Sequence, residues 1–482
     1  MEKVNQNFVQ PVRLLLSDKA WARWTALALV ASMMLFAYMF VDVMSPLQSL
    51  VQTQRGWSPD AFGYYAGAEY ILNVFGFLIL AGIILDKMGV RFTGTLSASL
   101  MVIGAVVKLY AISDMFQGSA LDSWLSSWWT VMPGSAKLAA LGFMVFGCGC
   151  EMAGITVSKT LAKWFEGKEM ALAMGLEMAI ARVGVFFIFT ISPRLADSVV
   201  PPSVVVPVAF CSGLLCIGLL CFIVFTFMDL KLDKQMGAAK IAAETADDEE
   251  FKLSDVGAIF SSKLFWIIAM LCVLYYSAIF PFQRYAANML QCNLGISETQ
   301  ASDIFRWFPI GAAVLTPFLG YFLDKKGKGA SMLILGAILM IVCHLTFAFV
   351  VPATKSAVIT YSAIVVLGVS FSLVPAALWP SVPKIMDKRF LGSAYSLIFW
   401  VQNIGLAFVP IIIGKVITWS NPGVNDPLQY NYTVPMCCFA ALGVMALIFG
   451  VILKSMNSIH HYGLEDPNIK EDFEDVRLDG EA

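Results

Sequence analysis

Twelve apolar stretches, each long enough to cross a membrane, dominate the sequence of 482 residues. A helix needs about 20 mostly apolar residues to span the hydrocarbon of a bilayer. We therefore predict an all-α membrane protein with twelve transmembrane helices. The stretches lie near residues 24–45, 61–85, 92–112, 138–160, 170–191, 203–228, 264–288, 302–323, 330–350, 357–380, 391–414 and 434–454.

The composition supports this class and excludes others. Hydrophobic residues make up 59% of the chain and charged residues 14%, whereas a soluble domain is about 45–50% apolar and about 25% charged. This excludes a cytosolic enzyme, a disordered chain and a secreted disulfide scaffold. The balance of 32 Lys and Arg against 34 Asp and Glu argues against nucleic-acid binding. Most of the ten Cys lie in apolar stretches, and the three His form no metal-ligand spacing with Cys, so we expect no metal site. No other cofactor is expected.

A polar connector divides the twelve stretches into two sets of six. It spans Leu230–Ser261 and includes the acidic run Glu244–Glu250. Charge runs of this kind are usually solvated. We predict an N-terminal six-helix half at 1–229, a cytoplasmic connector at 230–261, a C-terminal six-helix half at 262–455 and a cytoplasmic tail at 456–482.

Lys and Arg are concentrated in the loops on one side of the predicted bundle. Cytoplasmic loops of membrane proteins carry an excess of these residues. Because the number of crossings is even, we expect both termini to be cytoplasmic. The segment Met1–Lys19 has no apolar core, so we expect no cleaved signal peptide.

A short loop pattern, G-x-x-x-D-K-x-G, occurs after both the second and the eighth stretch, and its copies begin 238 residues apart. Two copies at equivalent loops indicate duplicated halves. The alternative is a pair of tight polar loops that only carry lysines of the cytoplasmic side. The residues concerned are Gly82, Asp86, Lys87, Gly89, Arg91, Gly320, Asp324 and Lys325.

This pattern resembles the loop signature of the major facilitator superfamily, whose members have two pseudo-symmetric six-helix halves around a central site. The resemblance implies a latch. In that latch Gly82 lets two helices approach closely, Asp86 meets the start of a neighbouring helix, and Arg91 pairs across the halves. The second copy has Gly329 where the first has Arg91, so its latch is expected to be weaker.

Two ionisable residues of opposite charge lie in the fourth and fifth stretches. Glu151 lies 13 residues before Trp164, and Arg182 lies 14 residues after Lys168. At 1.5 Å per residue, each is roughly 20 Å from the hairpin that joins their helices, so they lie at similar depth. One interpretation is a salt bridge that holds the two helices together. The other is a zwitterion clamp, in which Glu151 receives an ammonium and Arg182 a carboxylate.

Further residues inside the stretches are candidates for a polar cavity, because intramembrane polar groups are functional hypotheses by default. Three prolines between 375 and 383 predict kinks in the tenth stretch beside Trp379. At least one of the adjacent amides Gln402 and Asn403 should face polar surroundings. Lys108 is expected to extend outward towards solvent. The other candidates are Tyr38, Asp42, Tyr65, Glu69 and Tyr276.

Short runs in the fourth, fifth, seventh, tenth and eleventh stretches, and in the loop after the fourth, carry a closer resemblance. They are Phe146–Glu151, Trp164–Glu169, Ala181–Gly184, Tyr275–Tyr276, Phe280–Phe282, Ala377–Pro380, Gly392–Tyr395 and Gln402–Leu406. These runs resemble the lysosomal dipeptide transporter branch of the superfamily and its bacterial relatives. The resemblance implies a uniporter of dipeptides, with the residues that engage the peptide termini falling on Glu151 and Arg182. The accessory subunit of the animal members is not implied for this chain.

We therefore expect a monomeric, alternating-access transporter of dipeptides. An enzyme is not expected, since the sequence has no nucleophile–base pair and no metal-ligand cluster. The alternative is a transporter of another small organic anion or carboxylate, which would use Arg182 as its anchor. Glu69 is an acid additional to those of the animal members and would fit proton coupling. Because the N-terminal segment has no acidic-dileucine signal, a bacterial inner membrane is favoured over a lysosomal membrane.

Overall fold

The computed structural model describes residues 15–166, 168–236, 256–386 and 391–467, and these residues contain helices but no β-strand. The helices of the N-terminal half are η1 (Leu16–Asp18), α1 (Ala20–Asp42), η2 (Ser45–Leu47), α2 (Gln48–Arg55), α3 (Pro59–Val74), α4 (Phe77–Ile112), α5 (Ala120–Ser126), α6 (Gly134–Trp164), α7 (Met170–Ala196) and α8 (Val205–Met236).

The C-terminal half contains a second series of helices. They are α10 (Val256–Phe260), α11 (Lys263–Leu294), α12 (Glu298–Phe305), α13 (Trp307–Lys326), α14 (Gly329–Leu345), η4 (Thr346–Val350), α15 (Val351–Thr354), α16 (Ala357–Ile385), α17 (Leu391–Ser420) and α18 (Thr433–His460).

The described chain crosses the bundle twelve times. Eleven helical segments are long and apolar enough to span a membrane. One of them, α4, turns at Gly89, whose φ of +75° and ψ of 171° are not helical. Residues 77–88 follow α3 after a break at Phe75–Gly76 and complete the second crossing, while residues 90–112 form the third. The predicted all-α membrane fold with twelve crossings is confirmed.

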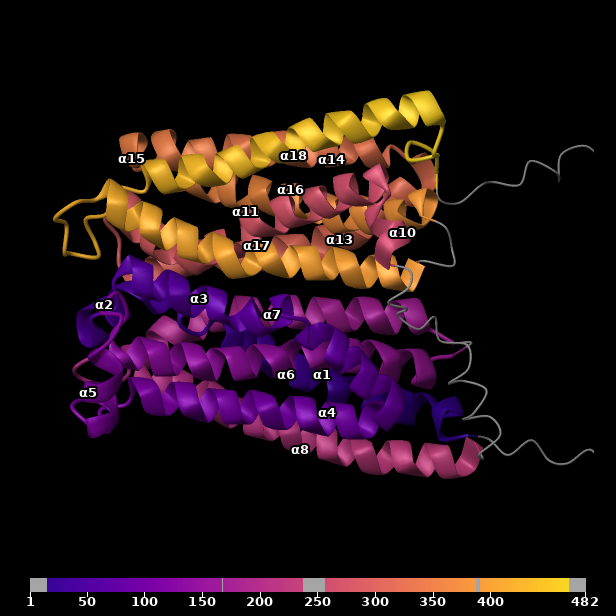
Figure 1. Ribbon diagram of the computed structural model, residues 1–482, viewed down its shortest axis with the longest axis horizontal. Helices are drawn as coiled ribbons and strands as arrows, with labels where there is room; N and C mark the ends of the chain where they lie inside the picture. The colour runs from indigo at the N-terminus through magenta and orange to yellow at the C-terminus, as the bar shows by residue number, and fades with distance from the viewer. Residues whose placement is uncertain (1–14, 167, 237–255, 387–390, 468–482) are drawn as a thin grey trace, which may run out of the picture.

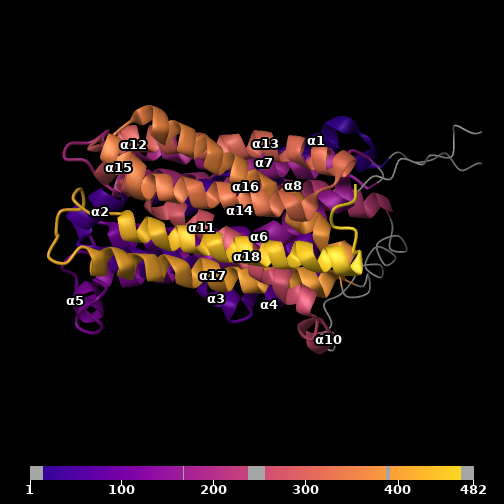
Figure 2. The same cartoon turned by 90° about the horizontal axis from the view of Figure 1, so that it is seen from above.

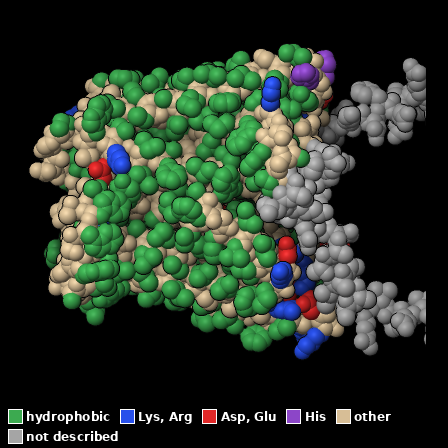
Figure 3. Space-filling view, in the orientation of Figure 1, with side chains coloured by type: hydrophobic (Ala, Val, Ile, Leu, Met, Phe, Trp, Pro, Cys, Tyr) green, Lys and Arg blue, Asp and Glu red, His purple; other side chains and the backbone are tan. Residues whose placement is uncertain are grey.

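The helices run along the long axis of the molecule, and the two halves lie side by side across it, with α17 next to α3 where they meet (Figure 1). Both described ends of the chain lie at one end of the bundle, which we call the terminal end. The opposite end, with α2, α5 and α15, is the distal end (Figures 1 and 2). Apolar side chains cover the flank between the two ends, and many of the charged side chains in view lie at the terminal end (Figure 3).

The contact between α3 and α17 depends on glycine. Gly67 lies against the backbone of α17 so closely that a Cβ there would collide with the carbonyl oxygen of Ala407. Farther along the same interface, the indole N–H of Trp400 donates a hydrogen bond of 2.8 Å to the carbonyl oxygen of Val74, where α3 ends. Small residues therefore let the halves touch backbone to backbone.

Polar contacts between the halves close the distal end. The Ser49 hydroxyl, on α2, donates to the Glu298 carboxylate on α12 at 2.8 Å. Arg194 of α7 makes two hydrogen bonds, of 3.1 and 2.8 Å, to the carboxylate of Asp303 on α12. At the terminal end, the described ion pairs instead join residues of the N-terminal half to one another.

The predicted boundaries of the halves stay a prediction. Helix α8 continues to Met236, past the predicted boundary at residue 229, and α10 falls within the predicted connector. The acidic run Glu244–Glu250 lies outside the described residues.

We expect Gly67→Ala to lower the stability of the bundle. The added methyl group would meet the backbone of α17, and overpacking typically costs about 1–3 kcal/mol. Thermal unfolding in detergent should therefore give a lower Tm. Gly213→Ala on α8 is the matched control, because a Cβ there has no other atom within 4 Å. Equal Tm values for Gly67→Ala and the wild type would contradict the close approach.

Candidate functional site

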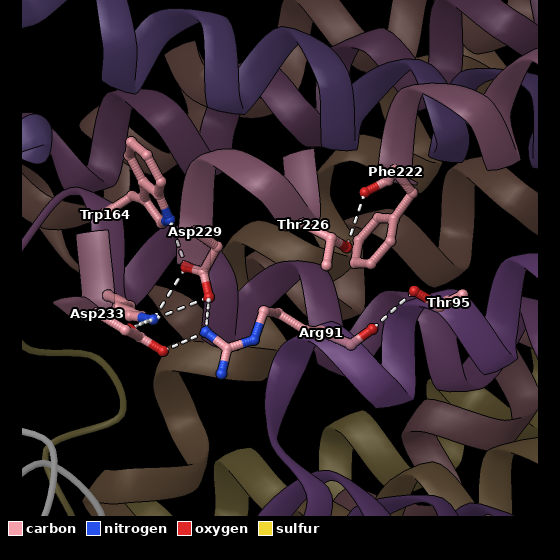
Figure 4. A network of polar contacts seen from close by, with 8 residues as sticks. Arg91, Thr95, Trp164, Phe222, Thr226, Asp229 and Asp233 are labelled. Atoms are coloured by element: carbon pink, nitrogen blue, oxygen red, sulfur yellow. Dashed lines mark hydrogen bonds and ion pairs between the residues drawn. The ribbon is translucent and has the colours of Figure 1, made fainter. Parts of the chain in front are cut away.

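A buried carboxylate organises the terminal end of the N-terminal half (Figure 4). The side chain of Asp229 on α8 is fully buried. It accepts hydrogen bonds from the Arg91 guanidinium at 3.2 Å, the Lys163 ammonium at 2.9 Å and the Trp164 indole at 2.9 Å. Asp233, one turn later, pairs with Arg91 and lies 2.5 Å from the Lys163 ammonium. The third, fourth and sixth crossings are thus joined by charge.

The partners of Asp86 and Arg91 differ from those implied by the resemblance. Arg91 was expected to pair across the halves, but its carboxylate partners belong to α8 of the same half. Asp86 was expected at the start of a neighbouring helix, but it pairs with Lys159 on α6 at 3.0 Å. The cause is the turn at Gly89, after which Arg91 opens the third crossing beside the acidic end of α8.

Among the described residues, no helix closely approaches the first glycine of either loop. A Cβ at Gly82 or at Gly320 would have no atom within 4 Å. Gly82, Asp86 and Lys87 instead border a pocket of about 280 Å³, whose far wall is formed by Phe399 and Trp400 of α17. The two halves therefore stand apart at this place, and the approach implied by the resemblance is absent from the conformation described.

The second loop is held by the end of the chain. After α18, the carbonyl oxygens of Leu464 and Glu465 accept the backbone N–H groups of Gly329 and Lys328, each at 3.0 Å. The Glu465 carboxylate accepts from the backbone N–H of Ser331 at 2.7 Å and from its hydroxyl at 2.9 Å. A carboxylate here faces the positive end of the α14 dipole.

The same segment, residues 463–466, also holds α16. The ammonium of Lys384 donates to the carbonyl oxygens of Gly463 and Asp466, each at 3.0 Å. Asp324 lies within electrostatic range of Lys384, and the Lys325 ammonium lies 4.9 Å from the centre of the Tyr321 ring. We call residues 463–466 the C-terminal strap. It joins the ninth, tenth and twelfth crossings, as Asp229 joins the third, fourth and sixth.

Glu151 of α6 and Arg182 of α7 are both partly buried inside the bundle. In the described part of the chain no ion pair joins them. Arg182 lies over two rings of the other half, with its guanidinium carbon 5.0 Å from the centre of Phe371 and 5.4 Å from that of Phe280. The Tyr38 hydroxyl lies within electrostatic range of both Glu151 and Arg182. The two charges therefore border one region of the bundle without neutralising each other directly.

Aromatic residues of the C-terminal half face this region. The Trp379 indole donates a hydrogen bond of 3.3 Å to the hydroxyl of Tyr276, which is within electrostatic range of Arg182. Trp379 also stacks on Phe399, with ring centres 4.8 Å apart. Phe280 stacks on Tyr276 at 5.6 Å. The sequence identified Tyr276 and Trp379 as candidates but gave no role to the phenylalanines.

The two amides of α17 have different surroundings. Gln402 accepts a hydrogen bond from the thiol of Cys272 at 3.2 Å. Asn403 donates to the Phe399 carbonyl at 3.0 Å, and its side-chain oxygen has no partner among the described residues although it is buried. Gln402 thus has the polar neighbour that the sequence led us to expect for one of the pair.

Asp42 and Glu69 are brought together by a residue that the sequence analysis left out. Arg284 of α11 reaches from the C-terminal half to Glu69 at 2.6 Å and to Asp42 at 3.2 Å. Gln283 donates to the other oxygen of Asp42 at 2.5 Å. All four side chains are buried. We call this group the distal gate. Arg284 lies in an apolar stretch, so the general rule for intramembrane charges could have identified it.

Tyr65 and Lys108 lie beside the distal gate. Tyr65 stacks on Phe143, with ring centres 4.8 Å apart, and its buried hydroxyl has no described partner. The prediction that Lys108 extends towards solvent is wrong, because its side chain is fully buried. Its ammonium lies against aromatic rings, and ring faces attract cations.

Comparisons with known proteins agree on one family. The model of the Major Facilitator Superfamily matches residues 28–289 and 284–460. The lysosomal dipeptide transporter MFSD1 of Danio rerio is 27% identical over 399 residues, covering 79% of this chain and 77% of the relative. The Homo sapiens protein of that name is 26% identical over 364 residues, covering 74% and 70%.

Solved structures share the fold at low sequence identity. The nucleoside transporter NupG superposes with a TM-score of 0.66 at 15% identity, covering 89% of this chain and 99% of that one. A D-xylose–proton symporter gives 0.65 at 14%, covering 90% and 97%. The fold is therefore common to carriers of unlike substrates.

We expect Glu465→Ala to lower the Tm and Glu465→Gln to lower it less. Alanine removes the acceptors of the Ser331 N–H and hydroxyl, and losing a helix cap costs about 0.5–2 kcal/mol. Glutamine keeps an acceptor oxygen but loses the charge that faces the helix dipole. Thermal unfolding of the three proteins in detergent measures the order. Identical Tm values would contradict a stabilising role of the C-terminal strap.

Proposed function

Because the chain belongs to the major facilitator superfamily and is a multi-pass membrane transporter of small molecules, we propose that it carries dipeptides by alternating access. The observation that carries this proposal is the pair Glu151 and Arg182. They are oppositely charged, lie inside the bundle and are joined by no described ion pair. A dipeptide is a zwitterion at neutral pH, so its ammonium and carboxylate match the two side chains in sign.

The surroundings of Arg182 suit a carboxylate ligand. A guanidinium can stack on an aromatic face and still donate two parallel hydrogen bonds along its edge. The rings of Phe280 and Phe371 provide such faces. Burial among rings also weakens competition by water for the ion pair. Arg182 would therefore hold the peptide carboxylate in a fixed orientation.

Glu151 would hold the other end of the substrate. Its neighbours by electrostatic range include Tyr38 and, on the side of the distal gate, Glu69. The Glu151 carboxylate is joined by no described ion pair, so it can attract a cationic amine. Because the pair contacts only the peptide termini, the substrate's side chains would be selected loosely. The space for them would be lined by Tyr276, Trp379, Tyr38 and Gln402.

Three other candidates have a different assignment in this proposal. Asp42 and Glu69 are already paired with Arg284, and Tyr65 lies beside them. We assign these residues to closure of the distal end and not to the substrate. Asn403 keeps an unpartnered buried oxygen, which suits a further contact with a bound peptide.

The described conformation fits one state of an alternating-access cycle. Its distal end is closed by contacts between the halves, while the pocket beside Gly82 separates them at the terminal end. With the termini in the cytoplasm, as the distribution of Lys and Arg predicts, this state faces inward. The two relatives named as lysosomal dipeptide transporters support the substrate class. The bacterial inner membrane as the compartment and the monomeric state stay predictions, and no accessory subunit is assigned.

Ligand-induced shifts in Tm test the clamp, with L-alanyl-L-alanine as the probe. We expect Glu151→Gln and Arg182→Ala to weaken binding by roughly 10- to 100-fold each, since a hydrogen bond to a charged group contributes about 1.5–3 kcal/mol. Glu177→Gln on α7 is the control, because it removes a nearby carboxylate that is not part of the clamp. It should bind the dipeptide as the wild type does. Undiminished binding by both clamp variants would contradict the proposal.

N-acetyl-L-alanyl-L-alanine separates the two substrate classes. It keeps the carboxylate but has no ammonium, so a clamp should reject it, whereas an anion site based on Arg182 should accept it. Equal binding of the acetylated and free dipeptides would favour the organic-anion alternative.

We expect Gly82→Leu to abolish most transport while leaving the Tm close to that of the wild type. In the described state a side chain at residue 82 has free space. Closing the pocket would bring α17 towards it, so a bulky residue would block the opposite state. Uptake of labelled dipeptide into proteoliposomes measures the effect. Gly213→Leu, at an exposed glycine of α8 with equally free space, should transport normally. Normal uptake by Gly82→Leu would contradict closure at this place.

A further inference from the structure

Lys108 is a fully buried cation to which nothing above gives a role. Its ammonium lies 4.2, 4.6 and 5.1 Å from the ring centres of Phe40, Phe143 and Tyr65. In the described part of the chain, no group lies within hydrogen-bond distance of it. Ring faces replace only part of the hydration that a buried ammonium loses. The conformation described therefore holds Lys108 at a free-energy cost.

The carboxylates that could neutralise Lys108 are bound to a different cation. Arg284 pairs with both Asp42 and Glu69. Both cations lie near the same aromatic ring. The Arg284 guanidinium carbon is 5.7 Å and the Lys108 ammonium 4.6 Å from the centre of the Phe143 ring. One cation has two carboxylates and the other has none.

The two cations belong to different halves. Lys108 on α4 shares the N-terminal half with Asp42 on α1 and Glu69 on α3, while Arg284 lies on α11 of the C-terminal half. Opening the distal end separates the halves and takes Arg284 away from the carboxylates. Lys108 stays with them. Two of its ring neighbours flank these acids, since Phe40 lies two residues before Asp42 and Tyr65 one turn before Glu69.

We propose that Lys108 is the reserve counter-ion of the distal gate. When Arg284 withdraws, the Lys108 ammonium pairs with the carboxylates of Asp42 and Glu69 and offsets one of their two negative charges, so that opening the gate requires one proton fewer. The unpaired ammonium also destabilises the closed gate and offsets part of the stability of the Arg284 ion pairs. This inference rests on the alternating access of the proposed function and not on the identity of the substrate.

Few other ionisable groups face these residues. Cys211 of α8 lies within electrostatic range of Lys108. Glu151 of α6 and Tyr70 of α3 lie within range of Glu69. After Arg284 leaves, the local charges are those of Asp42, Glu69, Lys108 and Glu151, and Glu151 is unchanged in every variant below. Lys108→Met leaves the two acids without a cation. The double variant Glu69→Gln/Lys108→Met restores the net charge that these residues have in the wild type after Arg284 has left.

The first measurement is thermal stability of the protein without substrate. We expect Lys108→Met to have a higher Tm than the wild type, because removing the unpaired ammonium stabilises the closed gate. Lys108→Arg keeps the cation and should not gain stability. A Lys108→Met variant that is properly inserted but less stable than the wild type would overturn the proposal, since a purely structural lysine predicts that result.

The second measurement is dipeptide exchange in proteoliposomes at two pH values. At about pH 7.5, Lys108→Met should exchange at least about tenfold more slowly than the wild type. It should recover at about pH 5.5, where protons can replace the missing cation on the carboxylates. Lys108→Arg should be close to the wild type, and the double variant should be faster than Lys108→Met at the higher pH. A double variant no faster than Lys108→Met, or equal slowing at both pH values, would overturn the proposal.

A third measurement does not depend on the substrate. Probes introduced as unnatural amino acids at Thr53 and Asp426, exposed positions on the two halves at the distal end, report its opening as an increase in their separation. Lys108→Met should reduce the open population at about pH 7.5 and regain it at about pH 5.5. If the wild type fails to bind any dipeptide, this result still decides the role of Lys108. An open population unchanged by Lys108→Met would overturn the proposal.

Discussion

Charge is costly inside a membrane, and the pairing of the few buried charges governs the arrangement of the helices. Arg284 compensates Asp42 and Glu69 only while the two halves touch at the distal end. Asp229 is compensated within one half, whatever the halves do. Ion pairs inside a half can therefore make it rigid, whereas an ion pair between halves holds one conformation. The difference between these two kinds of pair divides the molecule into parts that stay together and parts that separate.

The duplicated halves reach the same result with different residues. In the first half, a carboxylate on the sixth crossing binds side chains at the start of the third crossing and the end of the fourth. In the second half, the C-terminal strap supplies the carboxylate and the carbonyl oxygens that bind the equivalent places. Gly329 stands where the first half has Arg91, and a chain segment that follows the last crossing supplies the contacts that an arginine supplies there. The two halves are therefore pseudo-symmetric in which helices are joined, but the residues that join them differ.

The sequence allowed the fold to be predicted because bilayer thickness sets the length of an apolar helix. It also indicated Glu151 and Arg182 as candidates, since a charge in such a helix stands out. Partners could not be predicted, because Arg284 and Glu69 are 215 residues apart in sequence. The direction of Lys108 could not be predicted either, because apolar residues surround its helix on every side. The free space at Gly82 depends on the conformation, which no sequence pattern specifies.

The C-terminal strap bears on how the protein is made. Residues 463–466 follow α18, the last crossing of the second half. The network around Asp229 can form as soon as the first half has left the ribosome, but the contacts of Ser331 and Lys384 must wait until the segment after the last crossing has been made. The two halves therefore mature at different times. Until the C-terminal strap has been made, the ninth and tenth crossings lack the contacts that hold them together at the terminal end of the bundle.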